Sequence, residues 1–280
     1  MRTRCVALPL VLLLAVPAAA QRRPPIRNEQ ANHTKMRAFN VGATAFFSVF
    51  SAMRQGQINS CRDFWRHLLI GGGAGAAFYE SKRLAGNGKV TAGWLLANAT
   101  ATIVENTASG EHPIGRIGYT VGPLRLRVAT PYVRDGAAKI DADVSIAQTI
   151  LLGAAFGAGE RVSFRNGLIA VDRDTPWNLE GRFPEGATFG VFPGVIPGAA
   201  RKTWHHETVH AIQAQQISST AEPVLTITRK RHGRRPLFAL RQVRLEWAYL
   251  PVFQSESRDY PEQWTEVEAW WLAEGTPVRP

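Results

Sequence analysis

Apolar segments alternate with short polar, basic turns between Asn28 and about Gly110. The apolar segments are Val41–Met53, Leu68–Tyr79 and Thr91–Val104. Each is 12 to 14 residues long, which is shorter than the roughly 20 residues that cross a bilayer as a helix. The pattern predicts a helical, small-residue-rich region over residues 21–110.

Seven small residues, Gly71–Ala77, lie within the second of these segments. Glycine in the interior of a helix costs roughly 1 kcal/mol relative to alanine, so such a run needs a reason. Small residues allow two helix backbones to approach closely, which is also the packing favoured between helices in lipid. Two interpretations remain open: a tightly packed helical hairpin in a soluble domain, or a membrane-associated hairpin.

The hydrophobic period shortens to two between residues 111 and 197, and glycine and proline interrupt it. Strict alternation of apolar and polar residues is typical of strands with one exposed face. Asn166–Gly167 predicts a hairpin turn, because both residue types tolerate positive φ. We therefore expect an antiparallel β region with strands at Ile117–Val121, Leu124–Val128, Ile140–Val144, Val162–Phe164, Leu168–Val171 and Thr188–Phe192.

The C-terminal region, residues 198–280, returns to a helical pattern. Its segment Ala199–Ile217 contains neither glycine nor proline and is expected to be helical throughout. Taken with the preceding regions, this predicts an α+β fold with an N-terminal helical hairpin, a central antiparallel sheet and a C-terminal helical region.

The first 20 residues have the composition of a secretory signal peptide. Arg2 and Arg4 precede an apolar stretch, Val6–Val16, and small residues, Ala18–Ala20, precede Gln21. We therefore expect an exported protein that is periplasmic, envelope-associated or secreted.

Composition and charge narrow the class of protein further. The chain has 45% apolar residues and two cysteines, which excludes a disordered chain and a disulfide-rich scaffold. Lys and Arg number 33 against 22 Asp and Glu, a formal net charge of +11 that becomes +9 once Arg2 and Arg4 leave with the signal. Nucleic acid is not expected as a partner of an exported chain, whereas an anionic membrane surface is a possible one.

The sharpest chemical signal is the pentapeptide His206-Glu207-Thr208-Val209-His210. Residues four apart lie on one face of a helix, so His206 and His210 can present imidazole nitrogens to one metal ion. Glu207 lies on the same turn and can take a proton from a metal-bound water as a general base. A catalytic zinc site keeps three protein ligands and one open position. The motif predicts two of those ligands for Zn²⁺.

A glutamate further along the chain can supply the third ligand. Here the last 80 to 90 residues, roughly, resemble the zincin metallopeptidases and, within them, the gluzincin branch. Gluzincins take the third ligand from a later E-x-x-A-D pattern, which implies Glu266, with Ala269 as the small residue that lets two helices approach. Trp270 replaces the aspartate of that pattern, so the bracing of the histidines departs from the family. Glu268 and the more distant Glu246 are the alternative ligands.

Other residues near the motif have weaker arguments. Gln213 lies on the face of His210 and can brace a ligand or a buried backbone group, whereas His205 points to another face and is not expected to bind metal. The Thr188–Phe192 strand can run along the cleft and pair with an extended peptide. Candidates for stabilising an oxyanion are Tyr249, Tyr260 and His232.

A basic run, Arg229–Arg235, is expected to be a turn between strands at Val224–Thr228 and Leu237–Leu240, or a contact with an anionic surface.

Two functions follow as hypotheses. The first is an exported zinc metallopeptidase in which His206, His210 and Glu266 hold Zn²⁺ and Glu207 is the base. The second is a non-enzymatic envelope or membrane-associated protein in which the metal site is structural or vestigial. A ligating glutamate beside both histidines, with a position left open near Glu207, favours the first.

Overall fold

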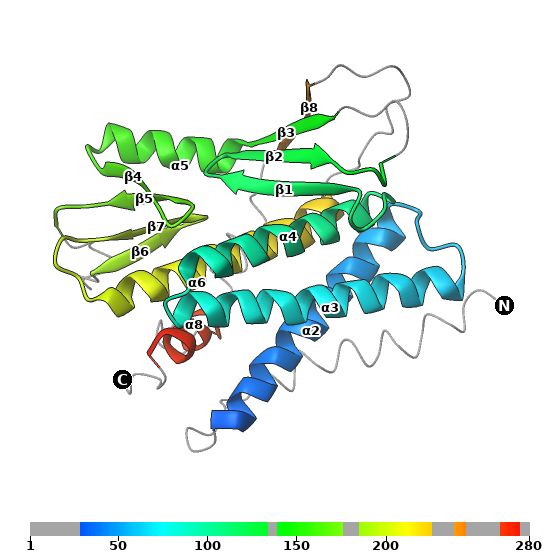
Figure 1. Cartoon of the computed structure of the whole chain (residues 1–280), viewed down its shortest axis with the longest axis horizontal. Coiled ribbons are helices and arrows are strands. Elements are labelled where there is room, and N and C mark those ends of the chain that lie inside the picture. Colours follow the sequence, from blue (N-terminus) through cyan, green and yellow to red (C-terminus); the bar gives the residue numbers. More distant parts are fainter. Residues whose placement is uncertain (1–28, 134–138, 176–184, 226–237, 245–263, 275–280) are drawn as a thin grey trace.

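The computed structural model describes residues 29–133, 139–175, 185–225, 238–244 and 264–274 of the chain. Within these ranges the protein is a mixture of six helices and eight strands, which agrees with the predicted α+β class (Figure 1). The expected signal peptide at residues 1–20 and the basic run Arg229–Arg235 lie outside the described residues.

Three long helices form the N-terminal region: α2 (Glu29–Arg54), α3 (Cys61–Gly86) and α4 (Val90–Ala108). Each contains one of the predicted apolar segments and extends past it, because polar residues on the solvent side continue the helical pattern. Ser60 begins α3 as an N-cap, since its hydroxyl accepts a hydrogen bond from the Asp63 N–H. No helix in the described part of the chain is both long and apolar enough to cross a membrane.

The glycines of α3 allow close contact with α2. A Cβ added at Gly71 would lie 2.6 Å from Ser48 Cβ, and one added at Gly75 would lie 2.3 Å from the backbone oxygen of Asn40. Gly73, between them, has no atom within 4 Å of such a Cβ. The predicted close approach of two helix backbones is therefore confirmed for Gly71 and Gly75.

A four-stranded sheet packs along α4, with strand order β1-β2-β3-β8. The strands are β1 (Arg116–Val121), β2 (Leu124–Ala129), β3 (Ile140–Ser145) and β8 (Phe238–Arg244). The first three pair antiparallel as predicted, but β8 pairs parallel with β3, so the sheet is mixed. A strand from the C-terminal third can join this way because the connection from β3 to β8 passes through several other elements.

The sheet turns its charged residues inward. Arg125, Arg127 and Asp143 are buried, and Arg125 and Arg127 form ion pairs with Glu105 of α4. The opposite face is apolar, and Ile117 and Val128, which pair across β1 and β2, are 64% and 54% exposed. The alternating pattern thus identifies the strands correctly, but the polar residues face the protein interior.

Two hairpins and a short helix follow the sheet. The β4 (Arg161–Arg165) and β5 (Leu168–Asp172) strands form the predicted hairpin, with positive φ at Asn166 and Gly167. The expected single strand at Thr188–Phe192 is wrong. Gly190, at φ +65°, turns the chain between β6 (Gly186–Phe189) and β7 (Phe192–Val195), because glycine adopts this conformation without steric cost.

Helix α5 (Ile146–Gly157) lies between β3 and β4 and was not expected from the sequence. Its apolar run carries no charged residue and no 3.6-residue polar stripe, so the sequence pattern does not distinguish a helix from buried strands.

Helix α6 (Arg201–Leu225) lies at the centre of the molecule and contacts α2, α3, α4, α8 and the β6–β7 hairpin (Figure 1). It contains the predicted helix and runs further. Val224 is helical, so the expected strand beginning there is wrong, whereas β8 contains most of the expected strand Leu237–Leu240. The last described helix, α8 (Trp264–Glu274), packs against α6. A single hydrophobic core joins buried residues of all three predicted regions.

Candidate metal centre

His206 and His210 lie one turn apart on the buried face of α6. Their ring centroids are 4.6 Å apart, and the two Nε2 atoms are separated by 3.0 Å. Both side chains are buried. The helical spacing of the motif therefore produces the predicted pair of converging imidazole nitrogens.

Glu266 of α8 completes the cluster. Its Oε2 lies 3.3 Å from His206 Nε2, and its Oε1 lies 3.3 Å from His210 Nε2. Ala269 is fully buried next to it on α8, as expected for the small residue where the two helices meet. Among the described residues, His206, His210 and Glu266 form the one group of three that can hold a metal ion.

The spacing of these atoms fits zinc. Ligands about 2.0–2.2 Å from a tetrahedral zinc lie about 3.3–3.6 Å from one another. The three separations here are 3.0, 3.3 and 3.3 Å. The donors are two imidazole nitrogens and a carboxylate, which is the ligand chemistry that zinc prefers. The two His–Glu266 separations agree with this range and the Nε2–Nε2 separation is slightly shorter, so the three residues can hold a metal ion such as zinc.

Burial and mutual charge set the protonation of this metal-free cluster. Burial lowers the pKa of His206, which stays neutral near pH 7. Burial would also lower the pKa of His210, but the adjacent Glu266 carboxylate outweighs it and raises the pKa to about 9. Burial would raise the pKa of Glu266, and the neighbouring histidines hold it well below its usual range instead. Without metal, His210 is thus the protonated partner of an ionised Glu266.

Glu207 lies beside the cluster and is itself buried. Its Oε2 accepts a hydrogen bond of 2.7 Å from the Thr188 hydroxyl of β6. Burial raises the pKa of Glu207 to about 7, against the opposing effects of His210 and Thr188. A carboxylate with this pKa can accept and return a proton near neutral pH, as the predicted role requires.

Gln213 braces His210 from behind. Its Oε1 lies 2.7 Å from His210 Nδ1, while its Nε2 donates to Glu268 Oε2 at 2.9 Å and to the Thr265 carbonyl at 3.0 Å. The predicted bracing role of Gln213 is confirmed. Glu268, which the sequence left open as a ligand, points away from the histidines, because residues two apart lie on different sides of a helix.

Trp270 stands where the resemblance would place a bracing aspartate. Its ring packs on His206, with ring centroids 4.3 Å apart. The buried Nδ1 of His206 has no hydrogen-bond partner among the described residues. The Nδ1 of His210 is therefore held by a polar side chain, whereas the Nδ1 of His206 has no such partner and its ring packs on Trp270.

The remaining sequence-predicted residues divide into two groups. His205 is half-buried beside Gly88 and is not part of the cluster, as expected. Glu246, Tyr249, Tyr260 and His232 lie outside the described residues. Lys82 and Asn40, which contact Glu268 from the N-terminal helices, were not singled out from the sequence, since nothing in the local pattern marks them.

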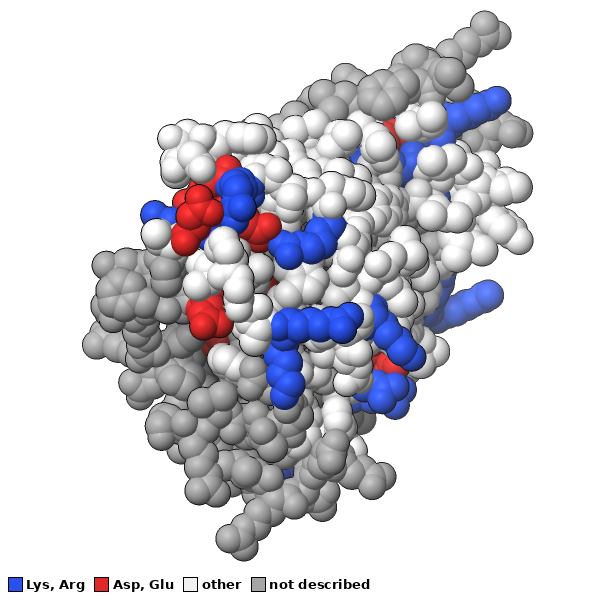
Figure 2. Space-filling model, turned by 60° about the vertical axis from the view of Figure 1, so that its left-hand side comes forward, with Lys and Arg blue, Asp and Glu red and all other residues white. Residues whose placement is uncertain are grey.

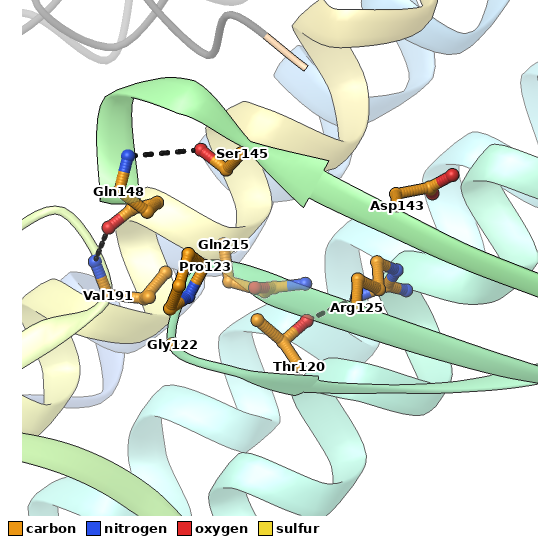
Figure 3. A pocket seen from close by; sticks show the side chains of 9 residues that line it. All are labelled: Thr120, Gly122, Pro123, Arg125, Asp143, Ser145, Gln148, Val191 and Gln215. Atoms are coloured by element: carbon orange, nitrogen blue, oxygen red, sulfur yellow. Dashed lines mark hydrogen bonds between the residues drawn. The ribbon is translucent and has the colours of Figure 1, made fainter. Parts of the chain in front are cut away.

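A small polar pocket lies elsewhere, between the sheet and α6 (Figure 3). It is lined by Thr120, Arg125 and Ser145, among others, and by Gln148, whose Oε1 accepts from the Val191 N–H. None of its lining residues belongs to the metal cluster. The pocket therefore contributes no side chain to the candidate metal centre.

Basic side chains are spread over the face shown in Figure 2 rather than gathered in one patch. In and next to the β4–β5 hairpin, Arg165 pairs with Asp172 and Arg173 pairs with Glu160. The expected contact with an anionic membrane therefore stays a prediction.

No protein-family model, curated protein or solved structure matches the chain. What the site can do therefore follows from its own residues.

Proposed function

We propose that this protein is an exported zinc-dependent metallopeptidase that hydrolyses peptide bonds. The observation that carries the proposal is the convergence of His206, His210 and Glu266 within ligand distance of one another, with Glu207 on the adjacent helical position. A ligating glutamate beside both histidines favours a peptidase over a non-enzymatic envelope protein. The expected signal peptide supports export.

Metal binding and proton transfer would be carried out by different residues. His206, His210 and Glu266 would hold the ion, which when bound lowers the pKa of a water molecule and polarises the scissile carbonyl. Glu207 would accept the proton of the attacking water and pass it to the leaving amine. Thr188 orients the Glu207 carboxylate through its hydrogen bond to Oε2 and leaves Oε1 for the proton transfer.

The position of β6 supports a peptide as the substrate. Within the described residues β6 pairs with β7 along one edge only, and its Thr188 touches Glu207. An extended peptide can add to such an edge by main-chain hydrogen bonds, which would bring its carbonyl groups past the catalytic carboxylate.

The non-enzymatic alternative has less support. A structural zinc site has four protein ligands, whereas the described residues supply three. A purely structural site also gives no reason for burying Glu207 beside the ligands.

The test combines metal analysis with peptide hydrolysis. The wild-type chain is expected to hold about one zinc per chain and to cleave a mixture of unstructured peptides. Glu207→Gln should keep the zinc and lose hydrolysis, and His210→Ala should lose the zinc. Full activity of Glu207→Gln would exclude the mechanism, and zinc-loaded wild-type protein without any hydrolysis would favour a non-enzymatic role.

A further inference from the structure

A continuous chain of buried polar contacts joins the metal cluster to the N-terminal helices. His210 Nδ1 contacts Gln213 Oε1, and Gln213 Nε2 donates to Glu268 Oε2. Lys82 of α3 donates to the same Oε2 at 2.6 Å, and Asn40 of α2 donates to Glu268 Oε1 at 2.7 Å. Lys82 and Glu268 are each 1% exposed.

From this chain of contacts we propose that Lys82 and Glu268 are positioning residues of the metal centre, which set the orientation and tautomer of His210 through Gln213. The proposal rests on the metal site of the proposed function. It gives the N-terminal helical region a role at the metal centre.

The chemistry of each partner fixes the direction of every hydrogen bond. The Glu268 carboxylate and the Thr265 carbonyl only accept, so the Gln213 amide must turn its NH₂ group toward them. Its oxygen then faces His210 and can only accept, which requires a proton on His210 Nδ1. In the neutral imidazole that binds a metal, this proton on Nδ1 leaves the lone pair on Nε2, the atom that faces Glu266. A metal ligand needs its lone pair at this atom.

Lys82 lies against the Glu268 carboxylate as its buried ion-pair partner. A buried carboxylate without a counter-charge is strongly destabilising. The three donors of the Lys82 ammonium group are all used, by Glu268 Oε2, by Asn40 Oδ1 at 2.6 Å and by Gln216 Oε1 at 3.1 Å. Gln216 in turn donates to Thr44 of α2 at 3.0 Å. The network is thus satisfied at each of these atoms.

A contribution to folding stability does not by itself explain the buried Lys82–Glu268 ion pair. Replacing a buried ion pair by apolar residues of similar size is often neutral or stabilising. Partners that hydrogen-bond to a metal-ligating histidine, by contrast, typically contribute about 10–100-fold to metal affinity. The buried pair reaches His210 through the hydrogen bond from Gln213 to Glu268, which an apolar pair could not accept. The Nδ1 of His206 has no such hydrogen-bond partner among the described residues.

The test measures zinc affinity by competition with a chelator and the visible spectrum of the Co²⁺-substituted protein. Gln213→Leu removes the brace but leaves the ion pair, and should weaken zinc about 10–100-fold and alter the Co²⁺ spectrum. The double variant Lys82→Met/Glu268→Met removes the pair without stranding a charge, and should have the same effect while remaining folded. Glu105→Gln, which disturbs the buried Arg125 contact in the sheet, is the matched control and should leave zinc affinity unchanged.

The Co²⁺ spectrum separates positioning from packing, because a loss of packing alone would leave the ligand geometry at the metal unaltered. Gln213→Leu and the Lys82/Glu268 double variant should both alter the spectrum, whereas Glu105→Gln should not. Unchanged affinity in both Gln213→Leu and the Lys82/Glu268 double variant would overturn the positioning role. A wild-type chain that binds zinc but cleaves no peptide would overturn only the proposed peptidase function.

Discussion

Gly186 in β6 lies directly against the carboxylate of Glu207. A Cβ added at Gly186 would be 2.7 Å from Glu207 Oε1 and 2.7 Å from Thr203 Cγ2. The absence of a side chain at this position is therefore what allows Glu207 to keep its place beside the metal cluster.

Substitution of Gly186 should separate catalysis from metal binding. Gly186→Ala is expected to displace Glu207, lower kcat by at least about tenfold and cost about 1–3 kcal/mol of unfolding free energy, while zinc content stays near one per chain. Peptide hydrolysis, metal analysis and chemical denaturation measure the three effects. Gly153→Ala in α5, where an added Cβ meets no atom within 4 Å, is the control and should leave all three near wild type. Wild-type kcat in Gly186→Ala would contradict the assigned position of Glu207.

The hydroxyl of Thr188 should affect the pH dependence of hydrolysis. Its hydrogen bond favours the ionised form of Glu207 and lowers the pKa of that group. Thr188→Val removes the bond, so the pKa should rise and the acidic limb of the kcat profile should move to higher pH. Thr188→Ser keeps the hydroxyl and should keep the profile. A profile that is the same in wild type and Thr188→Val would show that this contact does not tune Glu207.

Zinc binding to the metal-free protein should release about one proton at pH 7.5. His210 is protonated there, because its pKa is raised to about 9, and zinc binds only the neutral imidazole. Calorimetry in buffers of different ionisation enthalpy measures the released proton. Glu207→Gln removes any contribution from Glu207 and should still release about one. Release should fall toward zero as the pH rises past 9. Proton-free binding at pH 7.5 would contradict the ion pair of His210 with Glu266.

Two glycines of α3 should respond in opposite ways to alanine. Gly75→Ala forces a Cβ against the Asn40 backbone and is expected to destabilise the fold by about 1–3 kcal/mol. Gly73→Ala faces open space and should stabilise α3 by up to about 1 kcal/mol. Thermal and chemical unfolding of the two variants distinguishes them. Equal effects would show that the α2–α3 contact is looser than described.

Buried and exposed ion pairs should differ in their contribution to stability. Asp143→Asn leaves Arg127 buried with a weakened partner at the sheet, and about 3–5 kcal/mol of unfolding free energy should be lost. Glu80→Gln breaks the exposed pair with Arg83 and should change stability by less than about 0.5 kcal/mol. Denaturant titration measures both. A small effect at Asp143 would mean that the inner face of the sheet is hydrated.

Residues with a local pattern could be predicted from the sequence. The i, i+4 spacing places His206 and His210 side by side in any helix, and the Asn166–Gly167 turn needs no tertiary contact. Glu266 is implied as a ligand only by the resemblance to gluzincins. In the structure Glu266, and not Glu268, lies next to both histidines. The resemblance did not supply the brace, because Trp270 takes the place of its aspartate and Gln213 acts on the other histidine.

Features that depend on distant contacts could not be predicted. Lys82 resembles any charge at the end of an apolar segment until α3 packs against α8. The alternation of β1 to β3 identifies strands but does not reveal which face is buried. The apolar face of such a strand is usually the buried one, but here the polar face is buried, because Arg125 and Arg127 form ion pairs with Glu105 of α4. Parallel pairing of β8 has no local signature, since its partner β3 lies about 100 residues earlier in the chain.

The residues of the metal centre and its brace come together only late in folding. Asn40, Lys82, His210 and Glu266 come from four different helices and converge only when α2, α3, α6 and α8 have docked. A chain that is still being synthesised has the HExxH pentapeptide but lacks the third ligand and the brace. In the proposed peptidase, hydrolytic competence would therefore arise only once these four helices have docked.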